Sequence, residues 1–174
     1  PCLSDTRLGG MAGVYVWTVP TPHGELLYYV GQTSRSFARR MQEHLSEQLS
    51  GRYRLYEPAA FLRGEKRLLW RGVYGPGAEE SLGGFVENLP ALAPALVQVV
   101  RAMRFHVAPA AFEPRLQRRV EAALALLVQQ CQGLVGAFQD ADVRYAPRRP
   151  EEPPVLVRLS WQVQPLGAPT TLEA

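Results

Sequence analysis

Apolar residues gather in two short runs near the start of the chain. Residues 13–18 and 25–31 are rich in valine, tyrosine and tryptophan, which favour strands. Between them stands Pro-Thr-Pro-His-Gly, a composition typical of a turn. The pattern predicts a β-hairpin.

After the hairpin, apolar residues recur every four positions. They stand at Phe37, Met41, Leu45 and Leu49. This spacing predicts an amphipathic helix that Ser34 or Ser36 caps and that ends near Gly51. Arg40 and His44 border the apolar stripe one turn apart, a step that brings side chains about 5 to 6 Å from each other. One ligand can therefore contact both.

The middle of the chain is less regular. Residues 52–86 hold several glycines and prolines, so we expect a loop-rich insertion with one short strand near 68–73. A helix is expected over 90–103, with Asn88 as its cap, and a third strand over 104–108.

The clearest helix pattern begins at Pro114, a good first-turn residue, and runs to Gln132 with Gly133 as its stop. Its inward positions are predicted at Leu116, Val120, Leu124, Leu127 and Cys131. After a link rich in proline and arginine, residues 155–163 alternate like a last strand, and the tail is expected to be frayed.

Together these elements predict an α+β fold. A small antiparallel sheet of about three strands would be flanked by helices, with a loop-rich insertion and an extra C-terminal strand. Residues 1–11 would form an N-terminal extension, and 12–145 the main domain with its insertion at about 52–110. Residues 146–174 would form the C-terminal strand and tail.

Composition supports a globular protein with an anionic partner. Of 174 residues, 47% are apolar, which is enough for a core. All but one of the 19 basic residues are arginine, which binds phosphate with a planar fork, although a GC-rich genome gives the same bias. Residues 35–71 hold nine basic and four acidic residues, and 101–149 hold eight and four. Such local excess is expected where a polyanion binds.

Other sequence features exclude several classes. The two cysteines, Cys2 and Cys131, make no disulfide framework or metal-binding spacing, which fits a reducing compartment. No apolar run approaches the roughly 20 residues that span a bilayer, and no signal peptide is visible. A soluble, cytoplasmic protein without a membrane partner is expected.

An ordered set of motifs runs from the hairpin to the clearest helix. It comprises Gly13-Val14-Tyr15, Tyr29-Val30-Gly31 followed by Gln32-Thr33, Arg40-Met41-Gln42-Glu43-His44, and Arg118-Arg119-Val120-Glu121-Ala122-Ala123-Leu124. The set resembles the signature of the GIY-YIG nuclease superfamily and spans most of the chain. The resemblance implies a divalent-metal-dependent DNA endonuclease that hydrolyses phosphodiester bonds.

The resemblance also implies roles for individual residues. Glu121 would bind a single Mg²⁺ or Mn²⁺ that otherwise keeps its waters. Arg40 would grip the scissile phosphate. Tyr15 with His44 would position or deprotonate the attacking water, and Tyr29 would orient the phosphate. An unperturbed tyrosine, with a pKa of about 10, is a poor base at neutral pH and needs such help.

Further basic side chains are expected to contact DNA. They are Arg35, Arg39, Arg118 and Arg119. No separate DNA-reading module is recognisable, so sequence preference would come from the insertion, the C-terminal strand, or an additional domain or subunit. A homodimer is also possible, since a cut through both strands needs two active sites or two visits.

Several alternatives stay open. The asparagine that many members of the superfamily place after the glutamate helix has no counterpart, and Gln139 or Asp140 could substitute. Arg39 competes with Arg40, although only Arg40 is four residues from His44. Trp17, Tyr28 and Trp70 are interpreted as packing residues. The alternative function is a catalytically inactive nucleic-acid-binding or assembly module that retains the fold.

Overall fold

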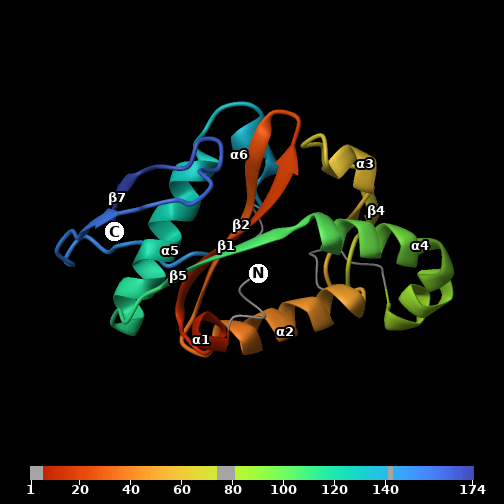
Figure 1. Cartoon of the computed structure of the whole chain (residues 1–174), viewed down its shortest axis with the longest axis horizontal. Coiled ribbons are helices and arrows are strands. Elements are labelled where there is room, and N and C mark those ends of the chain that lie inside the picture. The colour runs from red at the N-terminus through yellow and green to blue at the C-terminus, as the bar shows by residue number, and fades with distance from the viewer. Residues whose placement is uncertain (1–5, 74–80, 141–142) are drawn as a thin grey trace.

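The computed structural model describes residues 6–73, 81–140 and 143–174. Its centre is a three-stranded antiparallel sheet in the order β2-β1-β5, formed by β1 (Gly13–Thr21), β2 (Gly24–Thr33) and β5 (Arg104–Pro109). Helices α2 (Phe37–Leu49) and α5 (Pro114–Gln129) flank the sheet, as Figure 1 shows. The fold is α+β, as predicted.

The hairpin of β1 and β2 is longer than predicted and contains a β-bulge. Tyr15 pairs with Gly31 and Trp17 with Tyr29, but the next residue, Thr18, pairs with Leu27. Tyr28 is therefore the extra residue on β2. Its carbonyl oxygen accepts a hydrogen bond from the backbone amide of Asp140 at 2.9 Å.

Alternate residues of β1 point to opposite faces of the sheet. On one face Tyr15 packs against Phe37 and Met41 of α2. On the other face Val14 and Val16 pack in an aliphatic core against α5 and the C-terminal segment. The central strand thus separates an aromatic face from an aliphatic one.

Helix α2 begins as the sequence predicts. Ser36 is the N-cap, and its hydroxyl accepts a hydrogen bond from the Arg39 amide. The Phe37 amide donates to the Met11 carbonyl at 2.8 Å, which ties the helix start to the segment after α1 (Thr6–Gly9). Phe37, Met41 and His44 are buried against the sheet.

The insertion after α2 contains more structure than expected. It forms β3 (Leu55–Tyr56), α3 (Pro58–Phe61) and β4 (Leu68–Trp70), and β3 pairs with β4. The short strand near 68–73 is thereby confirmed over its first three residues, while β3 and α3 were missed. The segment 74–80, part of the predicted loop, lies outside the described residues.

Helix α4 (Leu82–Ala102) corrects the prediction of a helix over 90–103. The helix begins eight residues earlier, with Ser81 as its N-cap, and runs through Pro90 and Pro94. Asn88, the predicted cap, lies inside it and donates from its side chain to the Gly84 carbonyl. Packing of Phe85 against the core overrides the weak helix propensity of this turn.

Helix α5 is shorter than predicted. It ends at Gln129, and Gly133, at φ 69°, precedes a separate short helix, α6 (Leu134–Phe138). Leu127, predicted to point inward, is 40% exposed, whereas Leu124 is buried. Leu127 follows Leu124 by three residues, which turns it back about 60° around the helix, and Val128 takes the buried position instead.

The C-terminal segment is paired and not frayed. Strand β6 (Leu156–Arg158) pairs antiparallel with β7 (Thr171–Glu173) in a separate two-stranded sheet. The predicted strand over 155–163 is therefore shortened, and the extra strand does not join the central sheet. Leu172 is buried in the aliphatic core, which holds this ribbon beside α5 (Figure 1).

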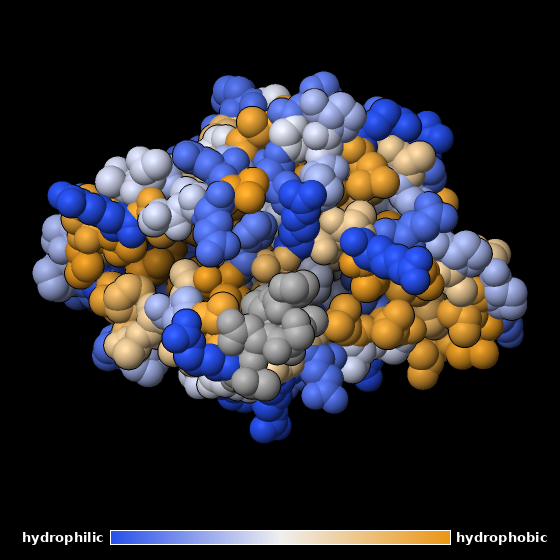
Figure 2. All heavy atoms as spheres, in the orientation of Figure 1, coloured by the Kyte–Doolittle hydropathy of each residue, from blue (hydrophilic) through white to orange (hydrophobic). Residues whose placement is uncertain are grey.

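The surface of α4 is unusually apolar. Leu82, Val86, Leu89 and Val97 are exposed along it. Figure 2 shows apolar atoms gathered over this helix, at the right of the molecule. Among the described residues α4 is the one helix whose length and composition would allow it to cross a membrane. The sequence has no unbroken apolar run of about 20 residues here, because Glu87, Asn88 and Gln98 lie within the helix.

Candidate active site

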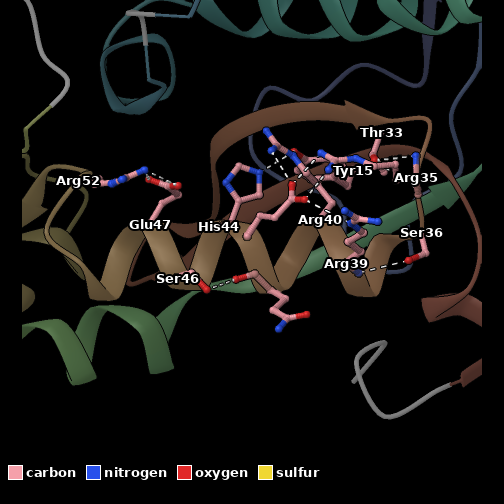
Figure 3. A network of polar contacts seen from close by, with 12 residues as sticks. Tyr15, Thr33, Arg35, Ser36, Arg39, Arg40, His44, Ser46, Glu47 and Arg52 are labelled. Atoms are coloured by element: carbon pink, nitrogen blue, oxygen red, sulfur yellow. Dashed lines mark hydrogen bonds and ion pairs between the residues drawn. The ribbon is translucent and has the colours of Figure 1, made fainter.

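Tyr15 stands at the centre of a buried hydrogen-bond chain. Its ring is 1% exposed, and its hydroxyl lies 2.7 Å from Nε2 of His44. Nε of Arg40 donates to the same oxygen at 3.1 Å. Figure 3 shows the three side chains converging above α2. Burial raises the pKa of Tyr15, and the nearby Arg40 partly offsets this.

His44 has a hydroxyl on each side. Its Nδ1 lies 3.2 Å from the hydroxyl of Tyr53, a residue that sequence reasoning missed. Because Arg40 donates to Tyr15, one arrangement satisfies every group: Tyr15 donates to Nε2, and Nδ1 donates to Tyr53. Burial lowers the pKa of His44 to about 4, and the positive charge of Arg40 adds to this effect. The imidazole is therefore neutral at pH 7.

The structure distinguishes Arg40 from Arg39. Arg40 turns inward to Tyr15 and also lies 3.3 Å from Glu43. The Arg39 side chain is 68% exposed and contacts Glu43 from outside at 3.6 Å. Glu43 also accepts two hydrogen bonds from Arg35, at 2.5 and 2.7 Å. A single carboxylate thus holds three arginines at the start of α2, which concentrates positive charge beside Tyr15.

Tyr29 lies next to Tyr15 on the same face, with ring centroids 6.2 Å apart. Gly31 makes this pairing possible. A Cβ atom at Gly31 would lie 2.5 Å from the Tyr15 hydroxyl and 2.7 Å from the Tyr29 ring. Any larger residue would force the two rings apart. Burial raises the pKa of Tyr29 well above its ordinary value, so the phenol stays protonated.

Glu121 reaches the site from α5, around the outer edge of β2. Its carboxylate accepts a hydrogen bond from the backbone amide of Gln32. Burial raises the pKa of Glu121 to about 7, against the opposing effects of this bond and of Arg40 and Arg118. The charge of Glu121 also raises the pKa of Tyr15 and Tyr29.

One turn before Glu121, a buried glutamine fixes α5 to the sheet. The Gln117 side-chain amide donates to the carbonyls of Gly13 and Thr33, at 3.2 and 2.8 Å, and to the Gln32 side chain at 3.0 Å. The helix is thereby registered against the ends of β1 and β2. Gln117 was missed because it looks like any polar helix residue in the sequence.

Comparisons with protein-family models, curated proteins and solved structures found no match. The GIY-YIG resemblance therefore rests on the residues of this chain and their geometry.

Two predicted DNA contacts fare differently on α5. Arg118 is exposed. Arg119 is buried, and its guanidinium donates to the carbonyls of Pro153 and Ala174 at 2.6 and 2.5 Å. Arg119 therefore anchors the C-terminal segment to α5, and we withdraw it from the predicted DNA interface. The sequence shows two adjacent arginines and does not indicate which of them is buried.

The two substitutes considered for the missing asparagine also differ. Gln139 is 1% exposed and lies in the core, although neither polar atom of its side chain has a hydrogen-bond partner. Asp140, the next residue, lines a cavity of about 430 Å³ together with Tyr29, Arg40 and His44. Asp140 is thus the substitute that lies beside the candidate catalytic residues.

The acidic groups around this cluster suit a weakly liganded cation. Among the described residues, no three His, Cys, Asp or Glu side chains lie close enough to hold a metal together. Glu121 offers a carboxylate whose charge acts on Tyr15 and Tyr29. A lone carboxylate fits Mg²⁺ or Mn²⁺, because such an ion keeps several waters and takes further oxygens from a phosphate.

Proposed function

We propose that the protein is a divalent-metal-dependent DNA endonuclease of the GIY-YIG type. The observation that supports this most is the chain from Arg40 through the Tyr15 hydroxyl to His44. Its groups are a phosphate-binding fork and a neutral imidazole, each within 3.1 Å of the hydroxyl between them. A core that served packing alone would not bury these polar groups together.

Arg40 is the group suited to the scissile phosphate. It is partly exposed and lines the cavity, whereas Tyr15 behind it is buried. A phosphate that draws the guanidinium forward would uncover the Tyr15 hydroxyl for the attacking water. The same planar fork would then stabilise charge that builds on the phosphate oxygens.

Tyr15 and His44 would move the proton of the attacking water. Tyr15 would accept it while passing its own proton to Nε2 of His44, so that Tyr15 stays neutral and the positive charge ends on His44. A tyrosine with a raised pKa does not ionise at neutral pH. In this relay Tyr15 does not have to ionise before the water attacks. Glu121 would hold the metal ion, which supplies Lewis-acid stabilisation of the departing oxygen.

The test is a cleavage assay on supercoiled and branched DNA with Mg²⁺ or with EDTA. We expect nicking with Mg²⁺ only. Glu121→Gln should abolish it and keep DNA affinity, because the amide still accepts from the Gln32 backbone but lacks the charge for a metal. Glu151→Gln, on an exposed residue, is the matched control. DNA binding without cleavage would replace this proposal with the inactive binding module.

A further inference from the structure

The cavity extends well beyond the groups that the proposed chemistry uses. Besides Tyr15, three aromatic rings surround the His44 ring: Trp17, Tyr29 and Tyr53 have centroids 5.8, 5.7 and 6.0 Å from it. All three are partly exposed and line the cavity. Trp17 had been interpreted as packing alone.

The same cavity is rich in arginine. Arg40, Arg52, Arg54 and Arg71 line it, and Asp140 is the single acidic residue among the lining side chains described. These arginines come from α2, the following loop and the end of β4. Segments apart in the sequence therefore bring positive charge to one place.

This pairing of aromatic faces with guanidinium groups matches the chemistry of a nucleotide. Every base has a flat face that stacks on aromatic side chains, and every phosphate accepts from arginine. The volume of about 430 Å³ falls in the range of roughly 300 to 1,000 Å³ typical of small-molecule sites. A duplex is too wide for such a cavity, and its bases are already stacked on each other.

Resting on the proposed nuclease function, we propose that this cavity binds one unpaired nucleotide of the DNA strand beside the scissile phosphate. Its base stacks between the rings around His44, and its phosphate lies among Arg52, Arg54 and Arg71. Arg40 and His44 belong both to the cavity and to the catalytic chain. The preferred substrate is therefore DNA with an unpaired nucleotide next to the cleavage position, as at a single-stranded arm or a bubble.

Binding can test this without cleavage. Fluorescence anisotropy in EDTA would compare a duplex with the same duplex bearing a short single-stranded arm. Stacking of one base is worth about 10-fold to 100-fold in affinity, so the arm should tighten binding by that factor. A 2-aminopurine base at the junction should lose fluorescence when it stacks. Equal affinity for both DNAs would overturn the proposal.

Two variants assign the effect to the cavity. Trp17→Leu should remove most of the preference for the arm and leave duplex affinity unchanged. Since Trp17 also packs on Phe105, a second variant avoids any folding defect: Arg71→Ala changes an exposed side chain. It should lower the salt slope for the armed DNA by about 0.7 and leave the duplex slope unchanged.

Arg158→Ala is the matched control, because it removes the same charge from exposed β6. It should leave the preference intact, and an equal loss there would contradict a cavity site. The two proposals fail separately. If the protein prefers the armed DNA but cleaves neither DNA, the nuclease proposal is wrong and the nucleotide site stands. If it cleaves both DNAs and binds them with equal affinity, the nuclease proposal stands and the nucleotide site is wrong.

Discussion

The two faces of the central sheet use buried positions for different purposes. Val14 and Val16 of β1 face α5 and carry only aliphatic carbon into a packed core. Tyr15, between them, faces α2 and carries a hydroxyl to Arg40 and His44. The strand is common to both, so the difference lies in the side chains alone. At these three positions, one face of the strand carries aliphatic packing and the other a buried polar chain.

The sharpest test of this division is Tyr15→Phe. Removal of one oxygen hardly changes volume, but it breaks the relay, and a positioned acid or base is typically worth about 10² to 10⁴ in rate. Single-turnover cleavage should fall by that factor at unchanged DNA affinity.

Tyr56→Phe is the control for this change, because it removes the same oxygen from a buried tyrosine elsewhere in the core. The double variant Tyr15→Phe with His44→Gln should be little slower than either single variant, since groups that act as one unit are not additive. Losses that multiply would mean that Tyr15 and His44 act independently.

The aliphatic face should respond in the opposite way. Leu124→Ala should lower the free energy of unfolding by about 3 kcal/mol in a urea titration, because it leaves a cavity in the aliphatic core that contains Val14 and Val16. Leu127→Ala, on the exposed side of the same helix, should cost far less. The folded fraction of Leu124→Ala should cleave normally. A large loss of turnover per folded molecule would show that the two faces are coupled.

A charge at Arg40 should not be sufficient for activity. Arg40→Lys keeps the charge but loses the fork, and removal of one positioned donor typically costs about 10² in rate. Single-turnover kinetics should show that loss. Arg39→Lys, next to it and exposed, should stay within a few-fold of the wild type. Equal losses in both would indicate that only the summed charge of the α2 start matters.

The polar face should also make stability depend on pH. The pKa of His44 falls from 6.5 to about 4 on folding, so the unfolded chain binds more protons between these values. The contribution of His44 to stability is therefore fully present above pH 6.5 and declines as pH falls towards 4. Glu121, whose pKa is raised to about 7, contributes in the opposite direction, so the two proteins must be compared at each pH. Urea unfolding should show about 2 kcal/mol more loss between pH 7 and pH 5 than in His44→Gln. The same pH dependence in both proteins would assign it to other groups.

Elements with a strong local signal were predicted well. The hairpin, α2, β5 and the start of α5 depend on turn residues, a serine cap and regular apolar spacing. The early start of α4 depends on where Phe85 packs, and pairing of β7 depends on a distant strand. The local sequence therefore predicts neither the start of α4 nor the pairing of β7.

The candidate site divides in the same way. The motif spacing predicted that Tyr15, Tyr29, Arg40 and His44 belong to one site. In the structure these four side chains lie next to one another. The sequence motifs could not show that Arg119 is buried or that Tyr53 contacts His44, since both depend on tertiary packing. The run Arg52-Tyr53-Arg54, alternating basic and aromatic, was the available signal for the cavity.

The bulge at Tyr28 gives the cavity a shape that side chains alone would not set. An extra residue in β2 lets the neighbours Tyr28 and Tyr29 both line the cavity, although adjacent strand residues normally diverge. The Tyr28 carbonyl also accepts from the amide of Asp140, which lines the same cavity. The width of the cavity is thus built into the main chain. Side-chain substitutions at Tyr28 or Tyr29 should therefore leave the main-chain link to Asp140 in place.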